Sequence, residues 1–146
     1  MIIRPRIATD DPEWLRMRRE LWPDGTAADH LQDMANWMAR ADTVVLVAVR
    51  RGGIHLGGFA EVGTRPYADG CKSSPVAYLE GWYVDADLRR QGVGAELILA
   101  AEAWARSRGL TEFASDALLE NTTSHRAHEA VGFLEVERAV RYRKEL

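Results

Sequence analysis

The feature that most constrains this chain is an apolar strand that runs through a glycine-containing turn into a long helix. The strand ends at Leu79-Glu80-Gly81-Trp82-Tyr83-Val84, and Arg89-Arg90-Gln91-Gly92-Val93-Gly94 follows. The periodicity predicts a helix from about residue 90 to residue 108, with Gly109 as the residue that ends it. The first turn of a helix carries backbone N–H groups without internal partners and a partial positive charge. The turn therefore predicts a phosphate or pyrophosphate site, to which Arg89 and Arg90 add fixed charge.

Two better-known phosphate motifs are absent from the chain. There is no Gly-x-x-x-x-Gly-Lys-Ser/Thr for a nucleoside triphosphate, and no Gly-x-Gly-x-x-Gly with a downstream acidic residue for a dinucleotide. An isolated Gly-x-Gly is more often a tight turn that allows close packing, so Gly92 and Gly94 alone leave both interpretations open.

The pattern of the remaining residues predicts a mixed α/β (α+β) fold. Hairpins in the first half favour antiparallel pairing, and strand–helix–strand units in the second half favour parallel pairing. The expected strands are 2–7, 43–49, 54–65, 75–84, 112–116 and 133–144, and the expected helices are 12–21, 26–40, 90–108 and 121–130.

Length and composition bound the class of protein. The 146 residues suit one domain over 1–146, and 47% hydrophobic with 28% charged residues is typical of a globular protein. No apolar run is long enough for a membrane span, and the N-terminus lacks a signal-peptide core, so we expect a cytoplasmic protein without a membrane partner. The net charge of −3 argues against nucleic-acid binding and favours a cationic partner.

Cysteine and histidine usage argues against structural disulfides and metals. Cys71 is the single cysteine, which excludes an internal disulfide and a cysteine-based zinc site. His125 and His128 have metal-ligand spacing on a helix, but no third strong ligand lies near them in the sequence, so no metal is expected.

Arg89-x-x-Gly92-x-Gly94 after an apolar strand resembles the coenzyme A signature of the GNAT acetyltransferase superfamily. The closing Ala130-Val131-Gly132-Phe133 and the element order over essentially the whole chain are similar as well. The resemblance implies a mostly antiparallel sheet with helices on both faces, and a coenzyme A cleft between two splayed strands. Acetyl-coenzyme A would be the co-substrate. The implied donor contacts are Trp82, Tyr83, Val84, Arg89, Arg90, Gln91, Gly92, Val93, Gly94, Ala95 and Asn121. Asn121 is equally compatible with a plain helix N-cap.

A narrower set of residues resembles aminoglycoside 6'-N-acetyltransferases. The matching segments are 79–84, 111–117, and Asn121 with Ser124-His125 and His128. This resemblance implies that an aminoglycoside, a polycation, is bound by carboxylates and an aromatic wall. The implied substrate contacts are Trp22, Tyr67, Glu80, Asp116 and Glu137. It also implies a homodimer formed through the C-terminal strand, over 136–142.

Three side chains are candidates for proton transfer. Glu80 could take a proton from the attacking ammonium, and Asp116 could hold and orient it; otherwise they are a solvated strand residue and a turn cap. His128 stands where many of these enzymes place a tyrosine that protonates the thiolate, and an imidazolium could replace it; otherwise it is a helix-face histidine. A backbone N–H near Val84 would polarise the thioester carbonyl. Because no histidine adjoins Cys71, direct transfer is preferred to an acyl-enzyme.

Other functions remain open at this stage. A related acetyltransferase could act on a protein N-terminus, a lysine or a polyamine. A coenzyme A-binding sensor without catalysis would keep Arg89, Gly92 and Gly94, and the unusual His128 keeps that alternative open.

Overall fold

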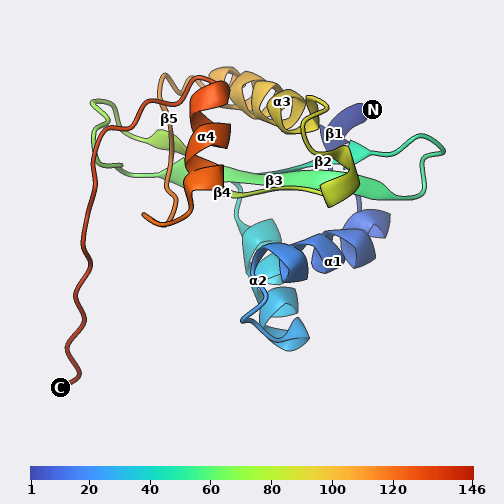
Figure 1. The fold of residues 1–146 in the computed structure, drawn as a ribbon, viewed down its shortest axis with the longest axis horizontal. Helices are drawn as coiled ribbons and strands as arrows, with labels where there is room; N and C mark the ends of the chain where they lie inside the picture. Colours follow the sequence, from blue (N-terminus) through green and yellow to red (C-terminus); the bar gives the residue numbers. More distant parts are fainter.

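The computed structural model describes residues 1–146 and contains one five-stranded sheet with helices on both faces (Figure 1). The strands are β1 (Ile2–Pro5), β2 (Val44–Val49), β3 (Leu56–Arg65), β4 (Val76–Val84) and β5 (Phe113–Ser115). The helices are α1 (Asp11–Leu21), α2 (Ala27–Ala39), α3 (Val93–Ser107) and α4 (Thr122–Ala130), with short 3-10 turns η1 (Ala8–Asp10) and η2 (Ala86–Leu88).

The strands lie side by side in chain order. The pairs from β1 to β4 are antiparallel, and β4 pairs with β5 in parallel. Helices α1 and α2 cover one face of the sheet, and α3 and α4 lie on the other (Figure 1). The expected fold class is thus confirmed. No helix is both long and apolar enough to cross a membrane.

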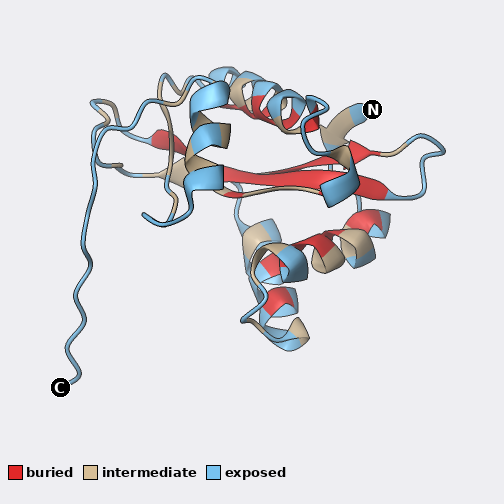
Figure 2. Cartoon of the chain, viewed as in Figure 1, coloured by how far each residue is buried: buried red, intermediate tan, exposed pale blue.

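Two hydrophobic clusters fill the space between the sheet and its helices (Figure 2). The cluster under α3 includes Leu79, Leu97 and Ile98, and the cluster under α1 and α2 includes Trp14 and Phe59. Strand β2 contributes alternate residues to both clusters, which explains why its sequence is a continuous apolar run.

The helix ends mostly follow the local sequence signals. Thr26 caps α2, because its side chain accepts from the Asp29 N–H and the Asp29 carboxylate accepts from the Thr26 N–H, both at 3.1 Å. Gly109 follows α3 with a φ of +74°, as expected of a residue that ends a helix. Helix α3, however, begins at Val93 rather than at residue 90. Arg90 and Gly92 have φ values of 59° and 86°, which a right-handed helix does not admit.

The predicted final strand over 133–144 is wrong for this chain. No strand follows β5, and residues after α4 run away from the body as an extended segment (Figure 1). The alternating pattern is typical of a strand, but a strand needs an edge to pair with. Strand β5 has only three residues, and the segment's large apolar side chains are exposed: Leu134, Val136, Val140 and Tyr142.

Candidate active site

The centre of the site is a one-residue bulge in β4. Gly81 lies opposite Glu61 in β3, whereas Leu79 lies opposite Val62, so Glu80 is the extra residue. Backbone N–H groups in a regular strand alternate between its two edges, so residues eight apart should face the same way. Here the Ala77 N–H donates to Glu112 on the β5 side at 3.0 Å, and the Asp85 N–H donates to Gly57 on the β3 side at 2.8 Å. The extra residue of the bulge explains why these two N–H groups face different edges of β4.

Beyond the bulge, one edge of β4 has no neighbouring strand. The pairing with β5 ends at Leu79 and Ser115, whereas the pairing with β3 continues to Val84. By the alternation set at Asp85, the N–H groups of Trp82 and Val84 face away from β3, into the gap that β5 leaves. The Val84 carbonyl confirms this direction, because it accepts from Arg89 Nε at 2.9 Å. The expected divergence of β4 from β5 is therefore present.

The N-terminus of α3 forms an anion cradle at the end of this gap. Gly92 is its N-cap residue, and no side chain caps the helix. The first N–H groups of the 15-residue helix, starting at Val93, therefore lack side-chain partners, as an anion site requires. A Cβ on Gly92 would meet nothing within 4 Å, while a Cβ on Gly94 would lie 3.2 Å from the Trp82 ring. Gly92 thus leaves the cradle open, and Gly94 lets Trp82 pack beneath it.

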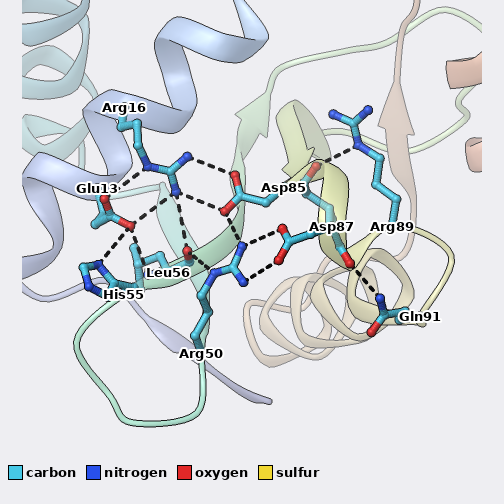
Figure 3. Close-up of polar contacts among 10 residues, drawn as sticks. Glu13, Arg16, Arg50, His55, Leu56, Asp85, Asp87, Arg89 and Gln91 are labelled. Atoms are coloured by element: carbon cyan, nitrogen blue, oxygen red, sulfur yellow. Dashed lines mark hydrogen bonds and ion pairs between the residues drawn. The ribbon is translucent and has the colours of Figure 1, made fainter.

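An ion network lies under the turn between β4 and this helix (Figure 3). Asp85 accepts from both Arg16 and Arg50, and Asp87 accepts twice from Arg50 at 2.8 Å. Burial alone would raise the pKa of Asp85, but the hydrogen bonds from the two arginines lower it overall. Hydrogen bonds from Arg50 likewise lower the pKa of Asp87.

On the face of the sheet that α1 and α2 cover, a pocket of about 320 Å³ opens between α2 and β4. It is lined by Arg18, Trp22, Gly25, Asp29, His30, Asp33 and Glu80. A second hollow shares Arg18, Asp33 and Glu80 and continues toward Trp37 and Arg40. Three carboxylates face one arginine in the first pocket, so the pocket suits a cation.

A row of polar side chains connects Glu80 with Asp116. Arg65 donates to both carboxylate oxygens of Glu80 at 2.8 Å, and its guanidinium lies 3.5 Å from the centre of the Tyr78 ring. The Tyr78 hydroxyl donates to Asp116. Burial and the Asp116 carboxylate raise the pKa of Tyr78, so it remains a donor at neutral pH. The structure thus connects the two predicted carboxylates through residues that the sequence did not single out.

A buried ion pair forms the floor of the second hollow. Glu61 is 3% exposed and accepts from Arg18 and from Trp14 Nε1. Burial raises the pKa of Glu61, and Arg18 opposes this effect. The Arg18 guanidinium also lies 4.7 Å from the centre of the Trp22 ring. Gly81 is required there, because a Cβ would come within 2.7 Å of that ring.

His128 lies on the other face of the sheet, beside the gap. Its Nδ1 donates to the Ser124 carbonyl at 2.7 Å, and Nε2 lies 2.8 Å from the Ser115 hydroxyl. The ring packs edge-on against Trp82, with centroids 5.4 Å apart. His128 is therefore held at the point where β4 and β5 diverge, rather than on an exposed helix face.

Three predicted contacts lie outside these pockets. Tyr67 is an exposed residue of the loop between β3 and β4, and Glu137 lies in the extended C-terminal segment. These two segments meet where Val136 packs on Gly70. Asn121 caps α4, since its side chain accepts from the Ser124 N–H at 3.1 Å. The structure contains no group of three or more potential metal ligands.

The residues that the sequence missed are charged side chains on otherwise apolar patterns. Arg18 and Glu61 each interrupt such a pattern, whereas Arg65 ends β3. The interruption of β3 by Glu61 was the visible signal of a buried charge. Cys71 lies beside Glu112, and burial together with that carboxylate raises the pKa of its thiol. A raised pKa makes it a poor nucleophile, in agreement with direct transfer.

Comparisons with known proteins agree with this geometry. The model of the acetyltransferase (GNAT) family matches residues 11–133. An aminoglycoside N(6')-acetyltransferase type 1 of Klebsiella aerogenes is 51% identical over 148 residues, or 99% of this chain and 97% of that relative. Apo AAC(6')-Ig, an aminoglycoside 6'-N-acetyltransferase from Acinetobacter haemolyticus, has a TM-score of 0.93 at 38% identity, covering 100% of this chain and 99% of its own. AAC(6')-Iy in complex with the bisubstrate analogue CoA-S-monomethyl-acetylneamine has a TM-score of 0.92 at 37% identity, covering 99% and 98%.

The lowered pKa of Asp85 predicts a pH-dependent stability. A carboxyl group whose pKa is lower in the folded state contributes stability above its unfolded pKa, about 3.9, and loses it as the pH falls below that value. We expect Asp85→Asn to lower the free energy of unfolding by about 2 kcal/mol at pH 7. The difference from the unmodified protein should shrink between pH 5 and pH 3, measured by urea unfolding. Asp69→Asn, in an exposed loop, is the control, and a difference that is constant with pH would contradict the assignment.

Proposed function

The chain belongs to the acetyltransferase (GNAT) family, and we propose that it transfers acetyl from acetyl-coenzyme A to the 6'-amine of aminoglycosides. The observation that carries this proposal is the bulged segment of β4. The same few residues present unpaired N–H groups to a gap that ends at an anion cradle, and a carboxylate to an acidic pocket on the other face. A thioester donor with a pyrophosphate and a polycationic acceptor fit these two sites.

The acceptor side is suited to binding and deprotonating an ammonium. We assign Glu80 to the proton transfer, directly or through water, and Asp116 to holding the amine, with Trp22 as the aromatic wall. Arg65 donates to both oxygens of Glu80, which supports a cationic partner for this carboxylate. Tyr67 and Glu137 are assigned to the outer part of the site, where their two segments meet at Gly70.

The donor side binds and orients the thioester. Backbone groups of Trp82, Tyr83 and Val84 are assigned to the pantetheine arm, with Asn121 on its other side. The pyrophosphate is assigned to the cradle, formed by Arg89, Arg90, Gln91, Gly92, Val93, Gly94 and Ala95. An N–H at Trp82 or Val84 would stabilise negative charge on the carbonyl oxygen during transfer.

The reaction forms one bond and breaks one bond between heavy atoms, and it moves two protons. The neutral amine attacks the thioester carbonyl carbon, a C–N bond forms, and the C–S bond breaks. The amine proton leaves toward Glu80, and the departing thiolate takes a proton from His128, which then regains one from solvent. Because both substrates lie on opposite faces of the same strand segment, alignment is provided by the fold.

The two alternative functions, acetylation of another amine and coenzyme A sensing without catalysis, are less well supported. The relatives that match over the full chain are named aminoglycoside acetyltransferases, and the pocket carries several carboxylates, as a polycation requires. A sensor would need no proton donor, whereas His128 is fixed between Ser115 and Trp82 beside the gap.

The proposal also covers assembly and location. We place residues 1–146 in one acetyltransferase domain, supported by the continuous sheet, and the activity in the cytoplasm, supported by the free thiol of Cys71. We further propose a homodimer in which the C-terminal segments pair. Val136 and Val140 expose 65% and 73% of their surface on an extended segment, and a second copy could cover them.

The substrate assignment predicts which amines react. Kanamycin and tobramycin should release free thiol from acetyl-coenzyme A. An aminoglycoside with a 6'-hydroxyl should not, because a hydroxyl in place of the ammonium removes the reacting nucleophile. Spermidine and a lysine-bearing peptide serve as competing acceptors. Rapid turnover of either one, with the aminoglycosides inert, would overturn the acceptor assignment while leaving the donor site intact.

The role of His128 predicts a selective loss of turnover. His128→Gln keeps a hydrogen-bonding side chain but removes the acid, so kcat should fall about 100-fold. The KM values of both substrates should change little. His125→Gln on the same helix is the control, since His125 bonds the Leu118 carbonyl. Turnover within twofold of the unmodified protein would place the acid elsewhere.

The dimer proposal predicts the mass in solution. Light scattering after size exclusion should give twice the mass of one chain. Val140→Asp should give one chain mass, because a charge on the pairing segment disfavours burial. Arg141→Ser is the control, since neighbouring strand residues face opposite sides. A single-chain mass for the unmodified protein would contradict the dimer.

A further inference from the structure

We infer that Arg50, together with Arg16, is a positioning residue for coenzyme A. Neither arginine belongs to the turn that forms the donor cradle. Their guanidinium groups hold the two carboxylates of that turn, Asp85 and Asp87, and thereby fix the path of the chain into α3 (Figure 3). The inference deepens the proposed function and rests on it.

The contacts come from three separate parts of the fold. Arg16 on α1 donates to both oxygens of Asp85, at 3.0 and 3.1 Å. Arg50, at the end of β2, donates to Asp85 at 2.8 Å and to both oxygens of Asp87 at 2.8 Å. Arg50 Nε also donates to the Leu56 carbonyl at the start of β3, at 3.1 Å. The turn is therefore bound to the rigid sheet and to α1, rather than only to itself.

Close packing reinforces the same attachment. The Asp85 N–H donates to the Gly57 carbonyl at 2.8 Å. A Cβ on Gly57 would lie 2.3 Å from Leu88 Cδ1, so this glycine leaves the space that Leu88 of η2 occupies. The two ends of η2 are thus fixed relative to β3, one by hydrogen bonding and one by packing.

The held turn leads directly into the cradle. The Asp87 carbonyl accepts from Gln91 Nε2 at 2.7 Å, and the next residue, Gly92, is the N-cap of α3. Between them the chain adopts a positive φ at Arg90, a strained conformation that surrounding contacts must maintain. A shift of Asp87 would be passed to the N–H groups that face the pyrophosphate.

The positive charges of Arg16 and Arg50 have a second effect on the proposed donor site. Asp85 and Asp87 lie in the loop that binds an anion, and their negative charges would oppose it. Asp87 has 63% of its side chain exposed, so its charge is not hidden by burial. Arg50 neutralises it by a two-oxygen contact, so the charges of Arg89 and Arg90 are not drawn to this carboxylate and can act on the pyrophosphate.

The test measures coenzyme A binding by calorimetry in Arg50→Met, without an acceptor present. Methionine keeps an apolar side chain but loses every contact to the turn. We expect the Kd for coenzyme A and the KM for acetyl-coenzyme A to rise at least tenfold, while kcat and the KM for tobramycin stay within about twofold. Arg50→Lys keeps the charge but loses the guanidinium that contacts both oxygens of Asp87. Its Kd for coenzyme A should therefore lie between those of the unmodified protein and Arg50→Met. Arg6→Met is the matched control, because Arg6 makes a similar two-oxygen contact with Asp11 away from the donor turn.

Each outcome decides one question. If Arg50→Met and Arg6→Met lose thermal stability equally and both bind coenzyme A like the unmodified protein, the contacts of Arg50 with the turn are only structural and the inference is wrong. If kcat falls while the Kd for coenzyme A is unchanged, positioning of the donor is also excluded. If the unmodified protein binds no coenzyme A, the proposed function itself fails, which is distinct from a failure of the inference.

Discussion

The bulge at Glu80 is the constraint on which both halves of the site depend. If β4 paired regularly with β3, without the bulge, the alternation of β4 would continue unbroken past Leu79. Trp82 would then move from the α3 side to the acceptor side, and the N–H groups of Trp82 and Val84 would pair with β3 instead of facing the gap. The bulge also places Glu80 and Gly81 next to the pocket together, where Gly81 leaves room for the Trp22 ring. Donor and acceptor geometry are thus consequences of one local irregularity.

The donor turn and the acceptor pocket both contain arginine–carboxylate pairs, and the proposed function gives the two sets opposite roles. Under the proposed donor turn, arginines would neutralise the carboxylates so that an anion can approach. On the proposed acceptor side, Arg18 donates to Glu61 and Arg65 donates to Glu80. The two acceptor pairs differ in burial: Glu61 is almost fully buried, whereas the Arg65–Glu80 pair is partly open. A partly exposed pair is weaker than a buried one, so in the proposed function an incoming ammonium would replace Arg65 while the buried pair stays in place.

The sequence predicted what is encoded locally. The element order, the parallel pairing of β4 with β5 and the open helix N-terminus all follow from periodicity, glycines and capping residues. The bulge was not predictable, because Glu80-Gly81 fits a regular strand pattern equally well. The contact of Arg18 with Glu61 spans 43 positions and depends on how α1 packs on the sheet. The start of α3 was misplaced because the positive φ of Arg90 is imposed by the turn, not by residue preference.

The strand expected over 133–144 is the one wrong element. A single chain lacks a partner strand for it. Its alternating apolar residues encode a strand, but the chain offers no second edge for it, since β5 is only three residues long. The place where this segment touches the body is informative: Val136 packs on Gly70, in the loop that carries Tyr67, and Glu137 follows directly. In the proposed dimer, the pairing of two such segments would take place beside the Tyr67 loop and Glu137. On this view the outer wall of the acceptor site is formed by assembly, whereas its floor, Arg18 and Glu61, is already complete in one chain.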